Sequence, residues 1–155
     1  MLDELRDLYQ EVILDHGKNP RNFRHPDDAN RTAHGFNPMC GDTLFIYLKV
    51  DDEGVIQDCA FMGKGCAIST ASASLMTEIL KGKKEDEARV LFERFHLLCT
   101  EDPSADESED SDQDDMERLE VLSGVREFPV RVKCATLAWH TMSAALDGQQ
   151  EVTTE

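Results

Sequence analysis

One segment constrains the fold of this chain more than any other, because its side chains alternate between two faces over Thr43–Val50. Aliphatic residues occupy every second position there: Leu44, Ile46, Leu48 and Val50. A period of two is typical of a strand with one buried face. The turn residues Asp51–Gly54 follow, and Val55–Met62 reads as a returning strand. The sequence therefore predicts an antiparallel hairpin over residues 43–62.

Helical periodicity marks much of the remaining chain. Apolar residues recur at intervals of three and four in these segments: residues 1–16, 67–80, 88–98 and about 134–146. A short helix is also expected over 116–122, whereas residues 17–39 are rich in Pro, Asn, Gly and His and are expected to be irregular. Helices before and after a hairpin predict an α+β fold, a small antiparallel β-sheet packed against several helices.

The length of 155 residues fits one domain with a single core, expected over residues 1–146. Within it, residues 101–117 contain ten acidic side chains and no basic one. Such a segment cannot bury a core, so it is expected to be a solvated, poorly ordered insertion. Residues 147–155 are expected to form a flexible tail.

The formal net charge of −16 argues against two classes of partner. Nucleic acids and anionic membrane surfaces both attract clustered cations, so neither is expected to bind. The N-terminus lacks a basic and apolar secretory signal, and no apolar run approaches a membrane span. Five cysteines without regular spacing are more typical of metal or catalytic roles than of disulfides, which predicts a reducing, cytoplasmic location.

Three cysteines are expected at the ends of elements, where metal-binding and catalytic groups usually lie. Cys40 precedes the first strand, two residues before Asp42, and Cys66 follows a glycine-bearing loop at a helix start. Cys134 is expected to open the final helix. Zn²⁺ prefers four tetrahedral ligands, and these three thiolates with Asp42 would satisfy it. A helix N-terminus would also favour the thiolate form that metal binding and sulfur transfer require.

The pattern by itself leaves a second interpretation open, since a cysteine can also be a small buried hydrophobic residue. We expect this role for Cys59 within a strand and for Cys99 at the end of a helix. Asp42 has the alternative role of a solvated turn carboxylate. The histidines are expected to be surface, capping or structural residues: His16, His25, His34 and His140.

At these residues the sequence resembles the IscU/NifU-N family of iron–sulfur cluster assembly proteins. The segments Asn37–Asp42, Gly63–Ser69 and Arg131–Trp139 look like its three cysteine motifs, in the same order. Leu8–His16 and Asn19–Phe23 also look like the opening of that family. The resemblance covers most of the chain except the acidic insertion and the tail.

Within the family, the resemblance is to the SufU branch. IscU-type scaffolds place a histidine directly before the last cysteine, and this chain has Lys133 there. They also carry a Pro-Pro-Val-Lys chaperone-docking motif, where this chain reads Phe128–Lys133 without that motif. A long insertion between the second and third cysteines is also similar to SufU.

The resemblance implies a zinc-containing sulfur acceptor, with Zn²⁺ on Cys40, Asp42, Cys66 and Cys134. It implies that Cys40 takes persulfide sulfur from a SufS-type cysteine desulfurase, and that downstream Suf assembly proteins are further partners. Such a protein is sulfurtransferase-like and acts with the desulfurase rather than as a free-standing enzyme. The flexible loop with Gly41 beside Cys40 favours the same thiol as the acceptor.

Two alternatives stay open at this point. A scaffold would assemble a [2Fe–2S] cluster on the same residues, because soft thiolates suit both zinc and iron–sulfur clusters. Lys133 in place of histidine favours the acceptor, since the scaffold loses a ligand. A purely structural zinc module is the third hypothesis, and it is disfavoured because closed structural sites usually have Cys or His at all four positions.

Overall fold

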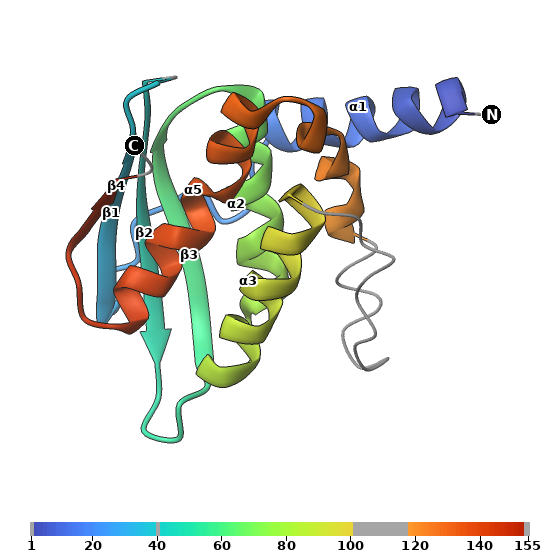
Figure 1. Ribbon diagram of the computed structural model, residues 1–155. Coiled ribbons are helices and arrows are strands. Elements are labelled where there is room, and N and C mark those ends of the chain that lie inside the picture. Colours follow the sequence, from blue (N-terminus) through green and yellow to red (C-terminus); the bar gives the residue numbers. More distant parts are fainter. Residues whose placement is uncertain (1, 40, 101–117, 154–155) are drawn as a thin grey trace.

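A four-stranded sheet with helices on one side organises this chain, as the computed structural model shows (Figure 1). The structure describes residues 2–39, 41–100 and 118–153. Its elements in chain order are α1 (Leu2–Lys18), β1 (Arg31–Asn37), β2 (Asp42–Val50), β3 (Ile56–Lys64), α2 (Ala67–Leu80), α3 (Glu85–Thr100), η3 (Glu120–Glu127), α5 (Pro129–Leu146) and β4 (Glu151–Thr153). The α+β fold predicted from the sequence is confirmed.

The predicted hairpin is present as β2 and β3. The two strands pair antiparallel, with Leu48 opposite Cys59. The aliphatic positions of β2 are buried, whereas Phe45 on the other face is 40% exposed. The alternation therefore identified the core face correctly, because one face of β2 packs on helices while the other carries the exposed side chains of Phe45 and Lys49.

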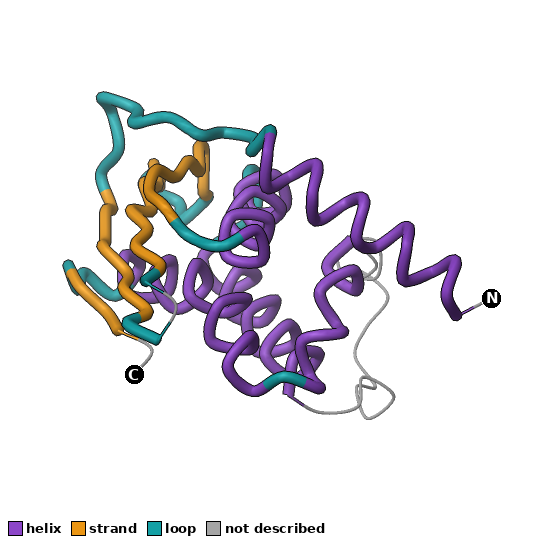
Figure 2. The backbone as a smooth tube through the Cα atoms, turned by 90° about the horizontal axis from the view of Figure 1, so that it is seen from above, coloured by secondary structure: helices purple, strands orange, loops and turns teal. Residues whose placement is uncertain are grey.

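The sheet has the order β3-β2-β1-β4, and it is mixed rather than purely antiparallel. β1 pairs antiparallel with β2, but β4 pairs parallel with β1. Figure 2 shows the strands gathered on one side and the helices on the other, with the loop from α1 to β1 passing around the sheet. On the outer face, the His25 ring from this loop stacks on Tyr47.

The first strand is a correction, because residues 17–39 were expected to be irregular. The sequence of β1 lacks the apolar alternation of a typical strand, because the residues on its inward face are small or polar. These buried residues are Ala33, Gly35 and Asn37. A Cβ on Gly35 would overlap the Thr141 hydroxyl, so glycine lets α5 pack directly against the strand.

The second and third predicted helices are confirmed. α2 has the predicted bounds and is buried along most of its length between the sheet and the other helices. α3 begins at Glu85 and presents its predicted apolar face to the core. The largest fully buried side chains come from strands and helices together and include Trp139, Phe61, Phe95, Leu91 and Met76.

The final helix begins earlier than predicted. α5 starts at Pro129, because proline fits the first position of a helix with its preset φ and its missing N–H. Cys134 therefore lies in the second turn of α5 rather than at its start. The short helix expected over 116–122 is also shifted: the chain is helical at Arg118 and Leu119 and continues as the 3₁₀ helix η3.

Two other predictions concern the segments outside this core. The predicted acidic insertion, residues 101–117, lies outside the described residues. The tail expected to be flexible contains β4, whose residues Glu151–Thr153 pair with His34–Phe36 of β1. The tail prediction was wrong at these positions because pairing with a distant strand edge satisfies their backbone groups. No helix in the described part of the chain is long and apolar enough to cross a membrane.

Candidate metal centre

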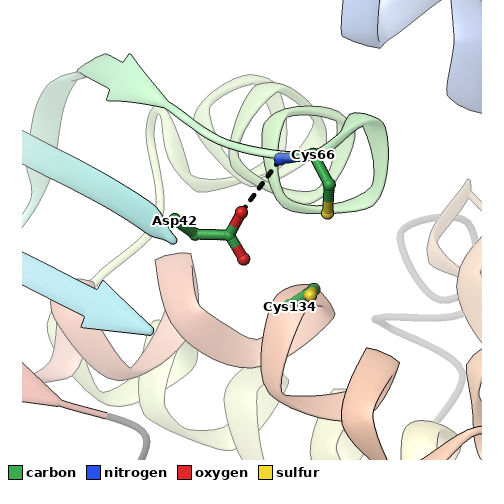
Figure 3. Close-up of side chains that lie close together, drawn as sticks. All are labelled: Asp42, Cys66 and Cys134. Atoms are coloured by element: carbon green, nitrogen blue, oxygen red, sulfur yellow. Dashed lines mark hydrogen bonds between the residues drawn. The ribbon is translucent and has the colours of Figure 1, made fainter. Parts of the chain in front are cut away.

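Three of the four predicted ligands come together at one end of the sheet. Asp42 opens β2, Cys66 precedes α2, and Cys134 lies on α5. Figure 3 shows their side chains gathered around a common centre. The ligand atoms of the three residues all lie within 4.8 Å of one another. Residues from three separate elements thus meet at one place.

The Asp42 carboxylate is held by hydrogen bonds at both of its oxygens. Its Oδ1 accepts the backbone N–H of Cys66 at 2.9 Å, and its Oδ2 accepts the Asn37 side-chain amide at 3.1 Å. Asp42 is fully buried. The alternative role as a solvated turn carboxylate is therefore excluded for this residue.

Glycine at position 65 makes the bond between Asp42 and Cys66 possible. A Cβ at Gly65 would lie 2.8 Å from Asp42 Oδ1 and 3.2 Å from Ser69 Oγ. Real side chains do not tolerate the first of these contacts, so a larger residue would push the carboxylate aside. The glycine loop before α2 is thus a packing requirement of the site.

Cys66 is the N-cap residue of α2, as its predicted position implied. Its backbone is extended, with φ −68° and ψ 169°, and its Sγ accepts the N–H of Ser69 at 3.4 Å. Unpaired N–H groups and the positive end of the helix macrodipole favour negative charge at this position. The half-buried Cys66 sulfur therefore lies beside the N–H groups that open α2.

Cys134 is fully buried on α5 and faces the other two donors. Its Sγ lies 3.6 Å from Asn37 Nδ2 and 3.8 Å from the Val130 carbonyl oxygen. Because α5 begins at Pro129, Cys134 is beyond the first turn, where helix-dipole stabilisation has faded. The expectation that Cys134 opens a helix was wrong, but its expected proximity to Asp42 and Cys66 is correct.

Cys40, the fourth predicted ligand and the predicted sulfur acceptor, lies outside the described residues. Its neighbour Gly41 has φ +71°, a left-handed conformation that glycine adopts without a steric penalty. The chain then enters β2 at Asp42, so Cys40 is two residues from a member of the group in the sequence.

The remaining cysteines and histidines lie elsewhere. Cys59 and Cys99 are fully buried in the core, which confirms their expected packing role, and burial raises the pKa of the Cys59 thiol to about 12. The described metal-ligand group contains none of the histidines. His34 stacks on Phe45, and His140 packs edge-on against Phe92.

One residue of the site was missed as a functional candidate. Asn37 was quoted only as the first residue of a motif, yet its amide contacts both Asp42 and Cys134. The structure explains this contact, because Asn37 is the last residue of β1 and pairs directly with Asp42, the first residue of β2. The sequence signal that could have found it is the short separation between Asn37 and Asp42. A strand periodicity in residues 31–37 would have placed both side chains on one face.

The donor set fits zinc. In a tetrahedral site with Zn–S near 2.3 Å, neighbouring ligand atoms are about 3.8 Å apart. The three described ligand atoms lie within 4.8 Å of one another, so a small movement of the side chains would bring them to that distance. Two sulfurs and one carboxylate oxygen leave room for one further ligand. The same sulfur donors also suit an iron–sulfur cluster.

Fold and site together define a small α+β domain with a cysteine and aspartate centre at the strand ends. A model of the NifU-like N terminal domain family matches residues 8–135. The chain therefore belongs to this family, and the resemblance indicated by the three cysteine motifs is confirmed.

Relatives in the family carry two kinds of name. The chain is 37% identical to the iron–sulfur cluster assembly scaffold protein IscU of Streptococcus pyogenes serotype M1, over 94% of this chain and 86% of that protein. It is 39% identical to the zinc-dependent sulfurtransferase SufU of Bacillus subtilis, over 87% of this chain and 86% of that protein. It is 40% identical to the iron–sulfur cluster assembly scaffold protein IscU of Thermotoga maritima, over 90% of this chain and 92% of that protein.

Solved structures agree on the fold. A crystal structure of a putative iron–sulfur cluster assembly scaffold protein for the SUF system from Fervidobacterium islandicum matches with a TM-score of 0.76. The two proteins are 30% identical, and the match covers 88% of this chain and 94% of that one. A hypothetical protein of known structure matches with a TM-score of 0.78 and 38% identity, over 91% of this chain and 98% of that one.

Proposed function

We propose that this protein acts in iron–sulfur cluster assembly as a zinc-containing sulfur acceptor that takes persulfide sulfur from a cysteine desulfurase. The observation that carries the proposal is the convergence of Asp42, Cys66 and Cys134 within 4.8 Å. The names of the relatives support the pathway, and the sulfurtransferase SufU supports the acceptor role. The expected partner is a desulfurase of the SufS type, followed by downstream Suf assembly proteins, in the reducing cytoplasm.

The proposed zinc ligands are Cys40, Asp42, Cys66 and Cys134. Bound zinc would keep the cysteines in the thiolate form and would tie together three elements of the fold. The described donors are already oriented for this: both Asp42 oxygens are hydrogen-bonded, and Cys66 Sγ accepts a helix N–H. With both sulfurs as thiolates beside the Asp42 carboxylate, the site would hold three anionic groups within 4.8 Å, and a bound cation would offset their mutual repulsion.

The proposed acceptor is Cys40. Its thiolate would attack the outer sulfur of the desulfurase persulfide, forming a new S–S bond as the old one breaks. The desulfurase cysteine leaves as a thiolate, and Cys40 becomes the persulfide. No external oxidant or reductant is needed, because the outer sulfur changes partner without a net change of electrons.

Two observations favour Cys40 over the other site thiols. Cys134 is fully buried on a helix, and Cys66 is occupied as the cap of α2. Helix-dipole stabilisation supports keeping Cys66 as a fixed ligand, but it does not apply to Cys134, whose fixed role rests on burial. Cys40 is followed in the sequence by Gly41, whose φ of +71° lies in the left-handed region that glycine adopts without a steric penalty.

A scaffold that assembles a [2Fe–2S] cluster on the same residues is the second candidate function. The IscU names of two relatives and the sulfur-rich donor set favour it. Lys133 stands directly before Cys134 and offers an ammonium group rather than an imidazole ligand, which favours the acceptor. The Asp42 carboxylate argues against a third function, a purely structural zinc module.

Two measurements test the proposal. The full chain, purified without oxygen, is expected to be colourless and to contain one zinc per chain; iron with visible absorption would support the scaffold instead. With labelled cysteine and a SufS-type desulfurase, the label is expected on Cys40. A Cys40→Ala variant should lose sulfur acceptance, whereas Cys99→Ala, at a buried cysteine outside the described ligand group, should keep it. Normal transfer by Cys40→Ala with label on Cys134 would overturn the assignment.

A further inference from the structure

The buried side chain of Asn37 links two donors that come from different parts of the chain. Asn37 is the last residue of β1, and Asp42 is its direct partner on β2. Both side chains are fully buried on the face of the sheet that meets α5. Asn37 thus stands between the first strands and the helix that carries Cys134.

The Asn37 amide nitrogen contacts both donors at once. Its Nδ2 lies 3.1 Å from Asp42 Oδ2 and 3.6 Å from Cys134 Sγ. A primary amide has two N–H groups, so one can donate to the carboxylate and the other to the sulfur. The opposite amide orientation would place its oxygen against two electron-rich atoms, which disfavours it.

The oxygen of the Asn37 side-chain amide makes no stabilising hydrogen bond with the described residues. Asn37 Oδ1 is buried and has no hydrogen-bond partner in the described part of the molecule. An unpaired buried acceptor destabilises a fold, and an apolar side chain of similar volume would avoid this cost. The contacts of the Asn37 amide nitrogen with Asp42 and Cys134 therefore explain why an asparagine with an unpaired oxygen is buried here.

We propose that Asn37 is a positioning residue of the metal centre, and that its amide fixes the Asp42 carboxylate relative to the Cys134 thiolate. The proposal rests on the metal-binding function proposed above. The bridge offsets the repulsion between two neighbouring anions and holds Asp42 Oδ2 in one direction before a cation arrives. Groups that orient metal ligands in this way typically change metal affinity by about 10–100-fold when they are replaced.

The test compares Asn37→Leu with Asn30→Leu. Asn30 is a matched control because its side chain also supports the strands, through the backbone of Val50, but lies away from the site. Zinc affinity is measured by competition with a chromophoric chelator, and melting curves are recorded on metal-free protein. Asn37→Leu should bind zinc about 10–100-fold more weakly than wild type and Asn30→Leu should bind it normally.

A spectroscopic readout separates positioning from a general loss of stability. Cobalt(II) replaces zinc, and its visible and charge-transfer bands report the ligand geometry. Asn37→Leu and Asn37→Asp, which keeps the shape but loses the amide donor, should both alter these bands. Asn30→Leu should leave them unchanged even if it melts at a lower temperature.

The outcomes distinguish this proposal from the one on which it rests. If wild type binds neither zinc nor cobalt, the proposed function fails and the role of Asn37 fails with it. If wild type binds tightly while both Asn37 variants keep its affinity and its cobalt spectrum, only the role of Asn37 is overturned. If Asn37→Leu does not fold, Asn37→Asp decides by the same two measurements.

Discussion

At the scale of single residues, the site depends on local backbone features as much as on its donors. Gly65 leaves space for the Asp42 carboxylate, and Gly41 adopts the left-handed conformation that leads into β2. Cys66 has two roles, since the same sulfur caps α2 and belongs to the ligand group. A substitution at Cys66 therefore affects both metal binding and helix stability unless the replacement preserves the cap.

Serine at position 66 separates these roles. Cys66→Ser keeps an N-cap side chain, because serine is among the preferred caps, but it removes the proposed thiolate ligand. Replacing a residue that only orients a metal ligand typically weakens metal binding by roughly 10–100-fold. We expect the loss of zinc affinity in Cys66→Ser to be larger than this, and the melting temperature of the zinc-loaded protein to fall with it. Metal-free melting should change little. Full zinc content and an unchanged holo melting curve would show that Cys66 is not a ligand.

At the scale of elements, α1 is joined to α2 through one buried histidine. His16 Nδ1 lies 2.7 Å from Ser74 Oγ, which also accepts the Arg21 backbone N–H at 2.8 Å. Burial lowers the pKa of His16, and the nearby Arg21 charge lowers it further. The contact between the helices therefore favours a neutral imidazole.

This contact predicts a pH dependence of stability. The folded-state pKa of His16 lies below its unfolded value of 6.5, so the unfolded chain binds the proton more readily. The free energy of unfolding should therefore be highest above that value and fall as pH drops below it, while the lowered aspartate pKa values act only in more acidic solution. Chemical unfolding of metal-free protein at about pH 7.5 and 5.5 measures this change.

The His16→Gln variant tests the assignment. It should show a smaller loss of stability between the two pH values than wild type. His140 is the comparison, because burial lowers its pKa as well. His140→Gln should remove only the part of the pH-dependent stability loss that comes from His140. An unchanged pH dependence in His16→Gln would rule out His16 as a contributor.

At the scale of the whole molecule, charge and site are separated along the chain. Residues 101–117 contribute ten of the negative charges, whereas every described member of the site lies before Leu80 or within α5. The flanking described residues are Thr100 at the end of α3 and Arg118, which forms an ion pair with Glu78.

Removal of the acidic segment tests this separation. A variant in which a short Gly-Ser linker joins Thr100 to Arg118 should keep one zinc per chain, because the described donors and their hydrogen-bond partners remain. The net charge should become less negative by ten, and the stability should become less sensitive to salt as repulsion decreases. Loss of zinc on deletion would show that the segment contributes to the site. Metal analysis and melting curves over a range of salt concentrations measure both effects.

The sequence by itself determined the parts whose signals are local. The alternation in residues 43–50 predicts β2 and its buried face, and the helical spacing after Cys66 predicts α2 with its observed bounds. The three cysteine motifs indicated the family and three residues that converge in the structure, Asp42, Cys66 and Cys134. These features follow from side-chain periodicity and from residue types at short spacing, which need no knowledge of distant contacts.

Only the tertiary structure decided the parts that depend on distant neighbours. β1 is a strand although its inward residues are small, because α5 packs closely over Gly35. β4 forms because residues near the end of the chain meet the free edge of β1, and no local pattern encodes that pairing. Asn37 joins the site for the same reason, since its amide meets Cys134, a residue 97 positions away, only when strand and helix pack together.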